Sequence, residues 1–271
     1  MHEAPTTVDT AATRTAPFFA LTLTFTLLVQ SPAVLARYGV LPGDLHQYMG
    51  LVALGALGPM LMAIVLSRRP AGGIRALMRS LVAWRVPVPY YVIALFGLAA
   101  IYIVARALYG AVVPTQLPWL YPPNKPEYVI AMFMFPLVEE IGWRGYALPR
   151  LQLRYGAFAA SALLGVAWAL WHTMMFLSAS DSPLVFVVGC LNVLVGSFAF
   201  TWLYNRTKGS LLLAVLLHMG AHLHNPSHAV PDITPLALQT AGLAVVVVAL
   251  MLFDPAAWRP PFPALPAERA P

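Results

Sequence analysis

The sequence predicts an all-α fold: a polytopic membrane helix bundle of about eight transmembrane helices, with the N- and C-termini in the cytoplasm. Composition is the first indication, because 60% of the 271 residues are hydrophobic and only 10% are charged. Ordinary soluble domains do not combine these values with a mean hydropathy of +0.74. The second indication is the recurrence of apolar runs of about 20 residues, the length that a helix needs to cross a hydrocarbon core about 30 Å thick.

Eight such runs follow one another along the chain. They are residues 17–36, 46–66, 87–108, 127–147, 157–177, 184–204, 210–226 and 234–253. The fourth and seventh runs are the least apolar, and both contain ionisable residues. No heptad, solenoid repeat or separate soluble domain interrupts the series, so we expect one integral-membrane domain over residues 17–254. Residues 1–16 and the proline-rich segment 255–271 are expected to be cytoplasmic tails.

The first run has an alternative interpretation as a cleavable signal peptide. Arg14 precedes it, and it ends in the small-residue stretch 31–36. Its removal would leave seven runs and would not explain the distribution of charge any better. We therefore treat residues 17–36 as a membrane span.

The basic residues indicate the orientation of the chain, because cytoplasmic loops of membrane proteins collect Lys and Arg. With eight spans and a cytoplasmic N-terminus, thirteen of the sixteen basic residues fall on the inner side. These are Arg14, Arg68, Arg69, Arg75, Arg79, Arg85, Arg144, Arg150, Arg154, Arg206, Lys208, Arg259 and Arg269. Arg37, Arg106 and Lys125 fall toward the outer side. The net charge of +6 is therefore interpreted as a topology signal, and we expect a lipid bilayer rather than a nucleic acid as partner.

Two adjacent carboxylates, Glu139 and Glu140, lie in the fourth run. Each acidic side chain near the centre of a bilayer costs about 2.5 to 3.5 kcal/mol on insertion scales, so a chain keeps such residues mainly for function. Neighbours on a helix point about 100° apart and are not expected to face the same cavity. Glu140 precedes Arg144 by four residues, the favourable order for a structural ion pair. Glu139 is then the expected chemical group.

Three further residues of the fourth run can change the shape of its helix. Pro136 lies one turn before the carboxylates and interrupts the helical hydrogen bonds. Gly142 and Gly145 permit close approach of a neighbouring helix. We therefore expect the carboxylates to lie where the helix is irregular and tightly packed.

Three histidines lie inside other apolar runs. His172 follows Trp168 by one turn in the fifth run, on the same face, and His218 and His222 share one face of the seventh. At about 1.5 Å per residue, these runs allow Glu139, His172 and His218 to meet near the middle of the membrane. A single membrane histidine is explained by hydrogen bonding between helices. Together with the carboxylates, however, the three histidines indicate a functional site.

These residues resemble the motifs of the CPBP family of intramembrane proteases, which comprises CAAX proteases and bacteriocin-processing enzymes and is also called the type II CAAX prenyl endopeptidase family. The family motif Glu-Glu-x-x-x-Arg looks like residues 139–144. A second motif, an aromatic residue one turn before a histidine, resembles residues 168–172, with Trp where Phe is common. A third, His-x-x-x-Asn, is similar to residues 218–222, with His in place of Asn. The resemblance covers about residues 127–225.

The resemblance implies hydrolysis of peptide bonds within the plane of the membrane. It implies an active-site set of Glu139, His172, His218 and His222, with Glu140, Arg144 and Trp168 as the remaining motif residues. The implied substrate is a peptide or a lipid-modified protein. The chain is rich in Arg, Ala and Pro, which favours a multi-pass protein of a bacterial plasma membrane.

Two mechanisms are compatible with this set. In one, Glu139 and His172 activate a water molecule, while His218 and His222 stabilise the oxyanion that forms. In the other, the three histidines hold Zn²⁺ and its bound water, and Glu139 serves as the base. The histidine spacing lacks the glutamate of the His-Glu-x-x-His motif of soluble zinc proteases, which slightly favours the mechanism without a metal.

Two other function classes use similar residues. Buried carboxylates and histidines also form the proton relays of proton-coupled transporters and channels. The sequence shows no inverted repeat and no matching pair of interrupted runs, which argues against a transporter. The third class is a catalytically silent immunity or scaffold protein of the membrane.

Overall fold

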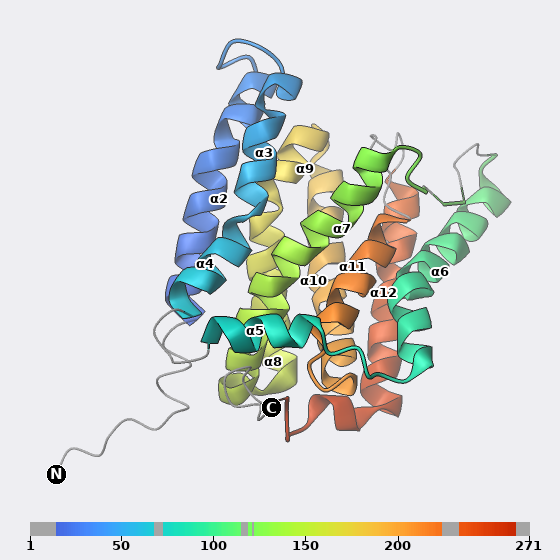
Figure 1. Cartoon of the computed structure of the whole chain (residues 1–271). Coiled ribbons are helices and arrows are strands. Elements are labelled where there is room, and N and C mark those ends of the chain that lie inside the picture. Colours follow the sequence, from blue (N-terminus) through green and yellow to red (C-terminus); the bar gives the residue numbers. More distant parts are fainter. Residues whose placement is uncertain (1–14, 68–72, 115–118, 121, 224–232, 264–271) are drawn as a thin grey trace.

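The computed structural model describes residues 15–67, 73–114, 119–120, 122–223 and 233–263, and within these ranges the regular structure is entirely helical (Figure 1). The expected all-α class is confirmed. Of the basic residues used to orient the chain, Arg14, Arg68, Arg69 and Arg269 lie outside the described residues, as do residues 224–226 of the seventh run.

The N-terminal part forms a pair of helical arms joined by the short helix η1 (Leu45–Tyr48). One arm is α2 (Thr15–Arg37), and the other consists of α3 (Met49–Ala56) and α4 (Gly58–Ser67). Two polar side chains of α2 bond to backbone carbonyls of α3: Thr26 Oγ1 donates to Gly55 at 2.8 Å, and Gln30 Nε2 donates to Val52 at 3.0 Å. These bonds satisfy groups that lipid could not satisfy. The first apolar run is thus an integral helix of the bundle.

Helix α5 (Gly73–Leu81) differs from the long helices, because it lies across the lower end of the bundle (Figure 1). It connects α4 to α6 (Val88–Val112), which runs along the other side of the molecule. The turn before α11 anchors the α5–α6 connection, since Ser210 Oγ donates to the carbonyl of Ala83 at 2.7 Å.

The central segment runs almost continuously helical from Pro126 to Ser178, a length of 53 residues. It consists of α7 (Pro126–Glu140), the π-helix η2 (Ile141–Ala147), α8 (Leu148–Trp171) and the start of α9 (Thr173–Ala179). A straight helix of this length would measure about 80 Å, far more than a bilayer spans. Gly156 turns the chain back, with φ 76° and ψ 170°, a conformation that favours glycine. The expected fourth and fifth spans are therefore the two arms of this one segment.

The C-terminal part consists of α10 (Pro183–Arg206), α11 (Leu211–His222), α12 (Thr234–Phe253) and the short helix η3 (Pro255–Trp258). Asn205 in α10 donates to the carbonyl of Ala257 at 2.8 Å, which holds η3 against the bundle. Helix α11 has 12 residues, or about 18 Å, and is too short to cross a membrane alone. It packs closely against α6, because a Cβ on Gly220 would lie 2.5 Å from the carbonyl oxygen of Leu95.

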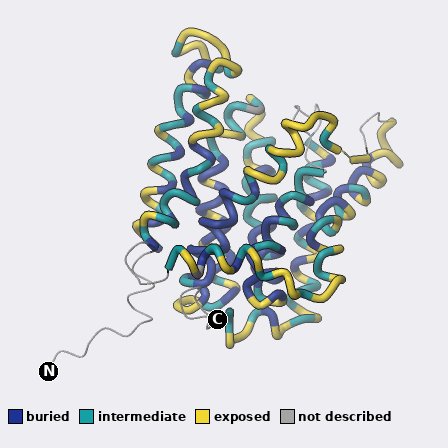
Figure 2. Tube along the Cα trace, viewed as in Figure 1, coloured by how far each residue is buried: buried dark blue, intermediate teal, exposed yellow. Residues whose placement is uncertain are grey.

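Six helical segments of the described chain are long and apolar enough to cross a membrane, compared with the eight runs expected from the sequence. Two expected spans fall in the single segment from Pro126 to Ser178, and the seventh is represented by the short α11. The central segment is the most buried: half of its apolar window is buried, compared with 33% or less in the other five (Figure 2). The count of eight and the cytoplasmic termini stay predictions.

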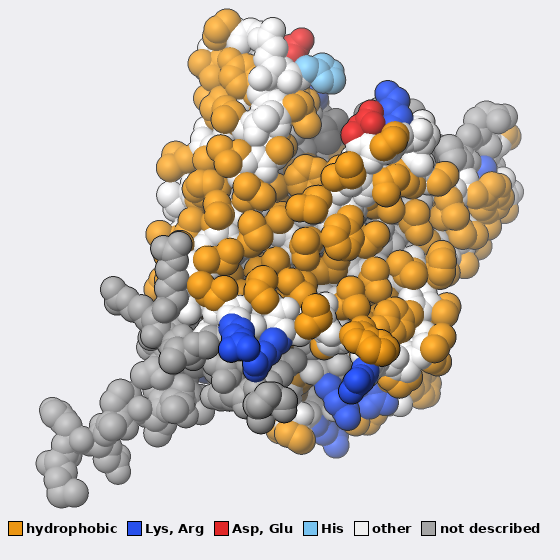
Figure 3. All heavy atoms as spheres, viewed as in Figure 1, with side chains coloured by type: hydrophobic (Ala, Val, Ile, Leu, Met, Phe, Trp, Pro, Cys, Tyr) orange, Lys and Arg blue, Asp and Glu red, His pale blue; other side chains and the backbone are white. Residues whose placement is uncertain are grey.

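The surface is apolar over most of its height, as expected for contact with lipid (Figure 3). Most of the basic side chains in this view gather at its lower end around α5, whereas the carboxylates are seen at the upper end together with a few basic side chains. This separation agrees with the inner and outer sides inferred from the sequence.

Candidate active site

The π-helix η2 begins directly after Glu140, and all seven of its residues are buried. Pro136 in the preceding turn has no backbone N–H to donate, and single π-helical turns are frequent at functional sites. Both expected close approaches are present. A Cβ on Gly142 would lie 2.4 Å from Pro59 Cβ in α4, and one on Gly145 would lie 2.6 Å from Leu77 Cδ1 in α5. At Gly142 a side chain would meet the backbone of α4, so glycine is required there, whereas at Gly145 the end of the Leu77 side chain fills the space that a Cβ would take.

Glu140 is fully buried, and one of its carboxylate oxygens contacts two other side chains. Its Oε1 accepts from Arg144 Nη1 at 2.8 Å, which confirms the predicted ion pair. The same oxygen lies 2.9 Å from Nδ1 of His218 in α11. Glu140 was expected as the structural partner of Arg144, and the structure adds His218 as a second partner. The two carboxylates do point in different directions, but each direction leads to a different helix of the same cluster.

Glu139 is directed toward α8. Its Oε2 accepts a hydrogen bond of 3.0 Å from the indole Nε1 of Trp168, which leaves Oε1 for another partner. Both side chains are buried, with 6% and 5% of their surface exposed. The indole of Trp168 lies edge-on to two imidazoles, with ring centroids 5.4 Å from His172 and 5.5 Å from His218. Trp168 is therefore the common neighbour of the glutamate and both histidines.

His172 caps the end of α8, and its orientation fixes one of its protons. Nδ1 lies 2.8 Å from the carbonyl oxygen of Trp168. A carbonyl can only accept, so Nδ1 carries the hydrogen, and Nε2 of the neutral ring has a free lone pair. The ring is also held between Trp171, at 4.8 Å edge-on, and Phe176, at 5.8 Å in a stacked arrangement. His172 is thus a positioned acceptor in the cluster.

His218 and His222 stack on successive turns of α11, with ring centroids 5.4 Å apart and an interplanar angle of 4°. His222 Nε2 is a buried atom without a hydrogen-bond partner among the described residues. This atom is therefore free to bind a group that enters the cluster.

Arg144 does more than balance the charge of Glu140. Its guanidinium lies 4.0 Å from the ring centroid of Trp168 and 4.0 Å from that of Phe200 in α10. Phe200 also contacts the edge of His218, with centroids 5.8 Å apart. Sequence reasoning missed Phe200, because one aromatic residue in a uniformly apolar run carries no signal of its own.

The three histidines do not fit a zinc site as they are placed here. Within the residues that the structure describes, no three His, Cys, Asp or Glu side chains are arranged to share one metal ion. His218 and His222 lie parallel, and the ring of Trp168 is packed against both His172 and His218. Converging ligands would need their free nitrogens about 2.0 Å from one point, which a tetrahedral zinc site requires.

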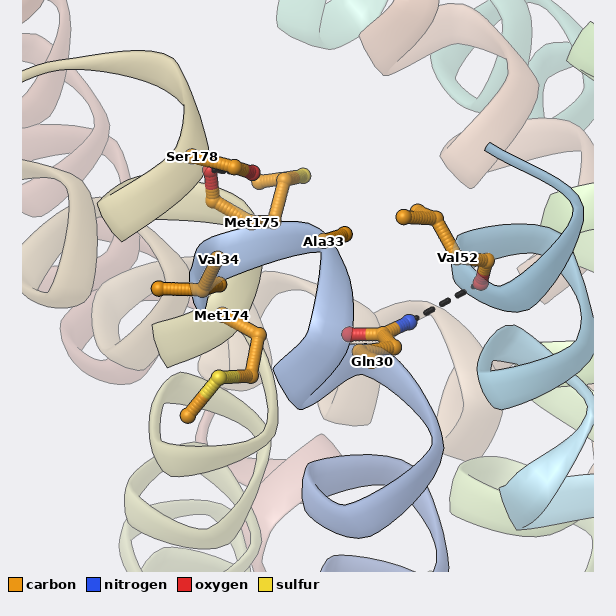
Figure 4. Close-up of a pocket in the computed structure, with 7 residues that line it drawn as sticks. All are labelled: Gln30, Ala33, Val34, Val52, Met174, Met175 and Ser178. Atoms are coloured by element: carbon orange, nitrogen blue, oxygen red, sulfur yellow. Dashed lines mark hydrogen bonds between the residues drawn. The ribbon is translucent and has the colours of Figure 1, made fainter. Parts of the chain in front are cut away.

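A small pocket opens between α2, α3 and α9 (Figure 4). It is lined by Gln30, Ala33, Val34, Val52, Met174, Met175 and Ser178. The space in it that the centre of a water molecule could occupy is about 10 Å³. That is roughly the room one water molecule needs, so the pocket is not assigned a ligand.

The fold and the cluster define a class: a polytopic membrane protein with buried carboxylates and histidines at the meeting point of three helices. Residues 123–224 match the family model of the type II CAAX prenyl endopeptidase Rce1-like proteins. The chain is also 32% identical over 139 residues to CAAX prenyl protease 2 of Methanococcus maripaludis, over 47% of this chain and 51% of that protein. It thus spans about half the length of this curated relative. The matched segment is thus similar to the Rce1-like family, in agreement with the resemblance of the three motifs.

Proposed function

We propose that this chain is an intramembrane endopeptidase that hydrolyses peptide bonds of membrane-associated peptides or proteins. The observation that carries the proposal is the buried cluster in which Trp168 joins Glu139, His172 and His218 from three helices. This cluster lies within the segment that matches the Rce1-like family. Hydrolysis of a peptide bond needs a base and a hydrogen-bond acceptor that are held close together, and Trp168 holds Glu139 and His172 in this way. A transporter or a silent scaffold has no such requirement.

Glu139 is proposed as the general base. With Oε2 held by Trp168, Oε1 can take a proton from a water molecule, and Nε2 of His172 can accept the second hydrogen bond of that water. The resulting hydroxide adds to the scissile carbonyl carbon. Glu139 then returns the proton to the amine that leaves, so the carboxylate is regenerated after each cycle.

His218 and His222 are proposed to stabilise the oxyanion of the tetrahedral intermediate. The contact of His218 Nδ1 with Glu140 orients the ring, and in its doubly protonated form the ring would donate from Nε2–H to the oxyanion. Nε2 of His222 has no competing partner among the described residues, so its hydrogen is available to the same oxygen.

We favour the glutamate mechanism over a zinc mechanism. The support is the arrangement of the histidine rings. The indole of Trp168 packs against both His172 and His218, where a shared metal ion would need their nitrogens to converge. No step of the proposed reaction therefore passes through a metal.

The substrate class is proposed from the relatives. The printed name of the Methanococcus maripaludis protein describes a prenyl protease, so a lipid-modified C-terminal peptide is one candidate substrate. A peptide or membrane-protein segment without a lipid is the broader proposal. We place the enzyme in a plasma membrane, and its composition favours a bacterial one.

The decisive experiment is Glu139→Gln in the purified full chain, assayed with a fluorogenic peptide in detergent. Loss of a general base lowers the rate by about 10²- to 10⁴-fold. Because the amide still accepts from Trp168, folded yield and Tm are expected to stay at the native values. Full residual cleavage would reject Glu139 as the base, and no cleavage by the native chain of a peptide library would reject the endopeptidase proposal itself.

A further inference from the structure

Helix α5 is amphipathic and lies across the end of the bundle where basic side chains gather (Figures 1 and 3). It connects two spanning segments, Leu45–Ser67 and Val88–Val112, and lies across the bundle (Figure 1). Leu77 on its inner face is 2% exposed, whereas Arg75 and Arg79, one turn apart, are exposed on its outer face. A helix of this kind buries its apolar face and presents its cations at the level of the lipid headgroups.

The residues that follow α5 extend this outer face. Trp84 is 62% exposed, and the guanidinium of Arg85 lies 5.6 Å from the centroid of its ring. Tryptophan is enriched at the membrane–water interface, because its ring is apolar and its N–H is polar. We call the set Arg75, Arg79, Trp84 and Arg85 the α5 surface.

The α5 surface carries three positive charges. Among the described residues, no carboxylate forms an ion pair with Arg75, Arg79 or Arg85. Asp254, which lies at the same end after α12, is already paired with Arg206 at 2.9 Å. Among the described residues, three arginines without a carboxylate partner thus lie beside an exposed indole, a surface that is suited to bind an anion.

We propose that the α5 surface binds the anionic phosphate headgroups of phospholipids in the inner leaflet. Arginine and phosphate are complementary in charge and hydrogen-bond geometry, and basic residues on an amphipathic helix at the cytoplasmic side are attracted to anionic lipid. Free phosphate would satisfy the charge alone. A phospholipid is favoured over free phosphate, because Trp84 and the apolar faces of α5 and the neighbouring spans lie beside the arginines. A phospholipid can contact these apolar groups with its acyl chains while its phosphate binds the arginines.

Lipid bound at this surface acts on the candidate active site through Leu77. The Cδ1 atom of Leu77 fills the space beside Gly145, where a Cβ would be 2.6 Å away. Gly145 follows Arg144 in η2, and Arg144 holds Glu140. A headgroup that fixes α5 therefore supports the turn that carries the buried ion pair, and lipid binding is expected to stabilise the whole fold.

The test uses the purified full chain in a neutral detergent and does not depend on proteolysis. Native mass spectrometry measures the binding of phosphatidylglycerol or phosphatidylcholine. Thermal unfolding measures whether the bound lipid stabilises the fold. We expect phosphatidylglycerol to be retained and to raise Tm, and phosphatidylcholine to do neither. Each arginine near a charged surface contributes about fivefold to association, so Arg75→Gln combined with Arg79→Gln should weaken phosphatidylglycerol binding by roughly 25-fold.

A matched control removes the same charge from the same end of the molecule. Arg154 in α8 and Arg259 after η3 are both exposed, and the double change to Gln should keep the native response to phosphatidylglycerol. An equal loss in this control would overturn the assignment to α5. An equal Tm increase with inorganic phosphate would overturn the lipid, and binding without any rise in Tm would overturn the coupling through Leu77.

Discussion

Nδ1 of His218 lies 2.9 Å from Oε1 of Glu140, and this contact joins two helices across 78 residues of sequence. The same oxygen accepts from Arg144, so one carboxylate organises both a cation and an imidazole in the interior of the bundle. Glu140 is thereby more than the counter-ion of Arg144. It orients the ring that we propose as an oxyanion donor, while its neighbour Glu139 bonds to Trp168 on the other side of the cluster.

Arg144→Ala should destabilise the fold. The change leaves the carboxylate of Glu140 fully buried with His218 as its remaining partner, and removing one partner of a buried ion pair costs about 3 to 5 kcal/mol. Thermal unfolding in detergent and the yield of folded protein measure the loss. Arg154→Ala on the surface should stay within about 0.5 kcal/mol of the native chain. A native Tm for Arg144→Ala would contradict the structural role of the pair.

Trp168→Phe should lower kcat, beyond the modest loss of Tm expected when a buried indole is shortened. Phenylalanine, which is common at this position in the family, keeps the aromatic contacts but removes the N–H that holds Glu139. A hydrogen bond to a charged group contributes about 1.5 to 3 kcal/mol, so kcat is expected to fall about 10- to 100-fold with KM unchanged. The matched control is Trp171→Phe, which breaks the bond of 2.9 Å to Thr26 and should lower Tm by a similar amount while kcat stays at the native value. A native kcat in Trp168→Phe would show that Glu139 does not depend on the indole.

His222→Asn and His222→Ala separate hydrogen bonding from ring stacking. Asparagine restores the residue common in the family motif and still donates, so kcat/KM should remain within about tenfold of the native value. Alanine removes the donor, and loss of one oxyanion donor costs about 10²- to 10³-fold in kcat. Assays of both variants with one peptide substrate give the comparison. Equal losses would assign His222 to its stacking on His218 instead.

Gly142→Ala should destabilise the protein by about 1 to 3 kcal/mol, the usual cost of overpacking a tight interior. The new Cβ would meet the Cβ atom of Pro59 at 2.4 Å and its carbonyl at 2.6 Å, and a backbone cannot move aside as a side chain can. Gly196→Ala is the control, because a Cβ there has no neighbour within 4 Å. Thermal unfolding should separate the two variants, and equal Tm values would refute the close packing of η2 on α4.

Cleavage should persist after metal is removed. In the glutamate mechanism no ligand set is needed, so prolonged dialysis against a chelator should leave kcat/KM unchanged. Elemental analysis of the purified chain should then find zinc well below one ion per chain. Stoichiometric zinc together with chelator-sensitive cleavage would reverse the choice between the two mechanisms.

Local spacing predicted several features correctly. The four-residue separation of Glu140 and Arg144 predicted their ion pair, and Gly142 and Gly145 predicted two close approaches in the same turn. These two predictions are correct because they depend on local properties of one helix. Spacing along the helix sets which side chains meet, and a glycine leaves room for a neighbour whichever helix supplies it. The residue that α11 would present to Glu140 could not be predicted in this way.

The lengths of the spans show the same limit. Hydropathy marks apolar runs, but the change of direction at Gly156 divides one helical segment of 53 residues into two arms. The seventh run is apolar enough for a span, yet only the 12 residues of α11 are helical within the described chain. Hydropathy measures what can lie in lipid, whereas helix ends depend on backbone conformation and on neighbouring helices.

The sequence by itself determined the membrane class, the basic side of the molecule, the family motifs and the set of ionisable residues that needed partners. Only the tertiary structure decided that His218 meets Glu140, that Trp168 holds Glu139, and that Phe200 and Leu77 support the cluster from α10 and α5. Helical spacing fixes the direction of a side chain on its own helix. Which helix lies in that direction is set by packing between segments that are far apart in the chain, and a local pattern does not encode that packing.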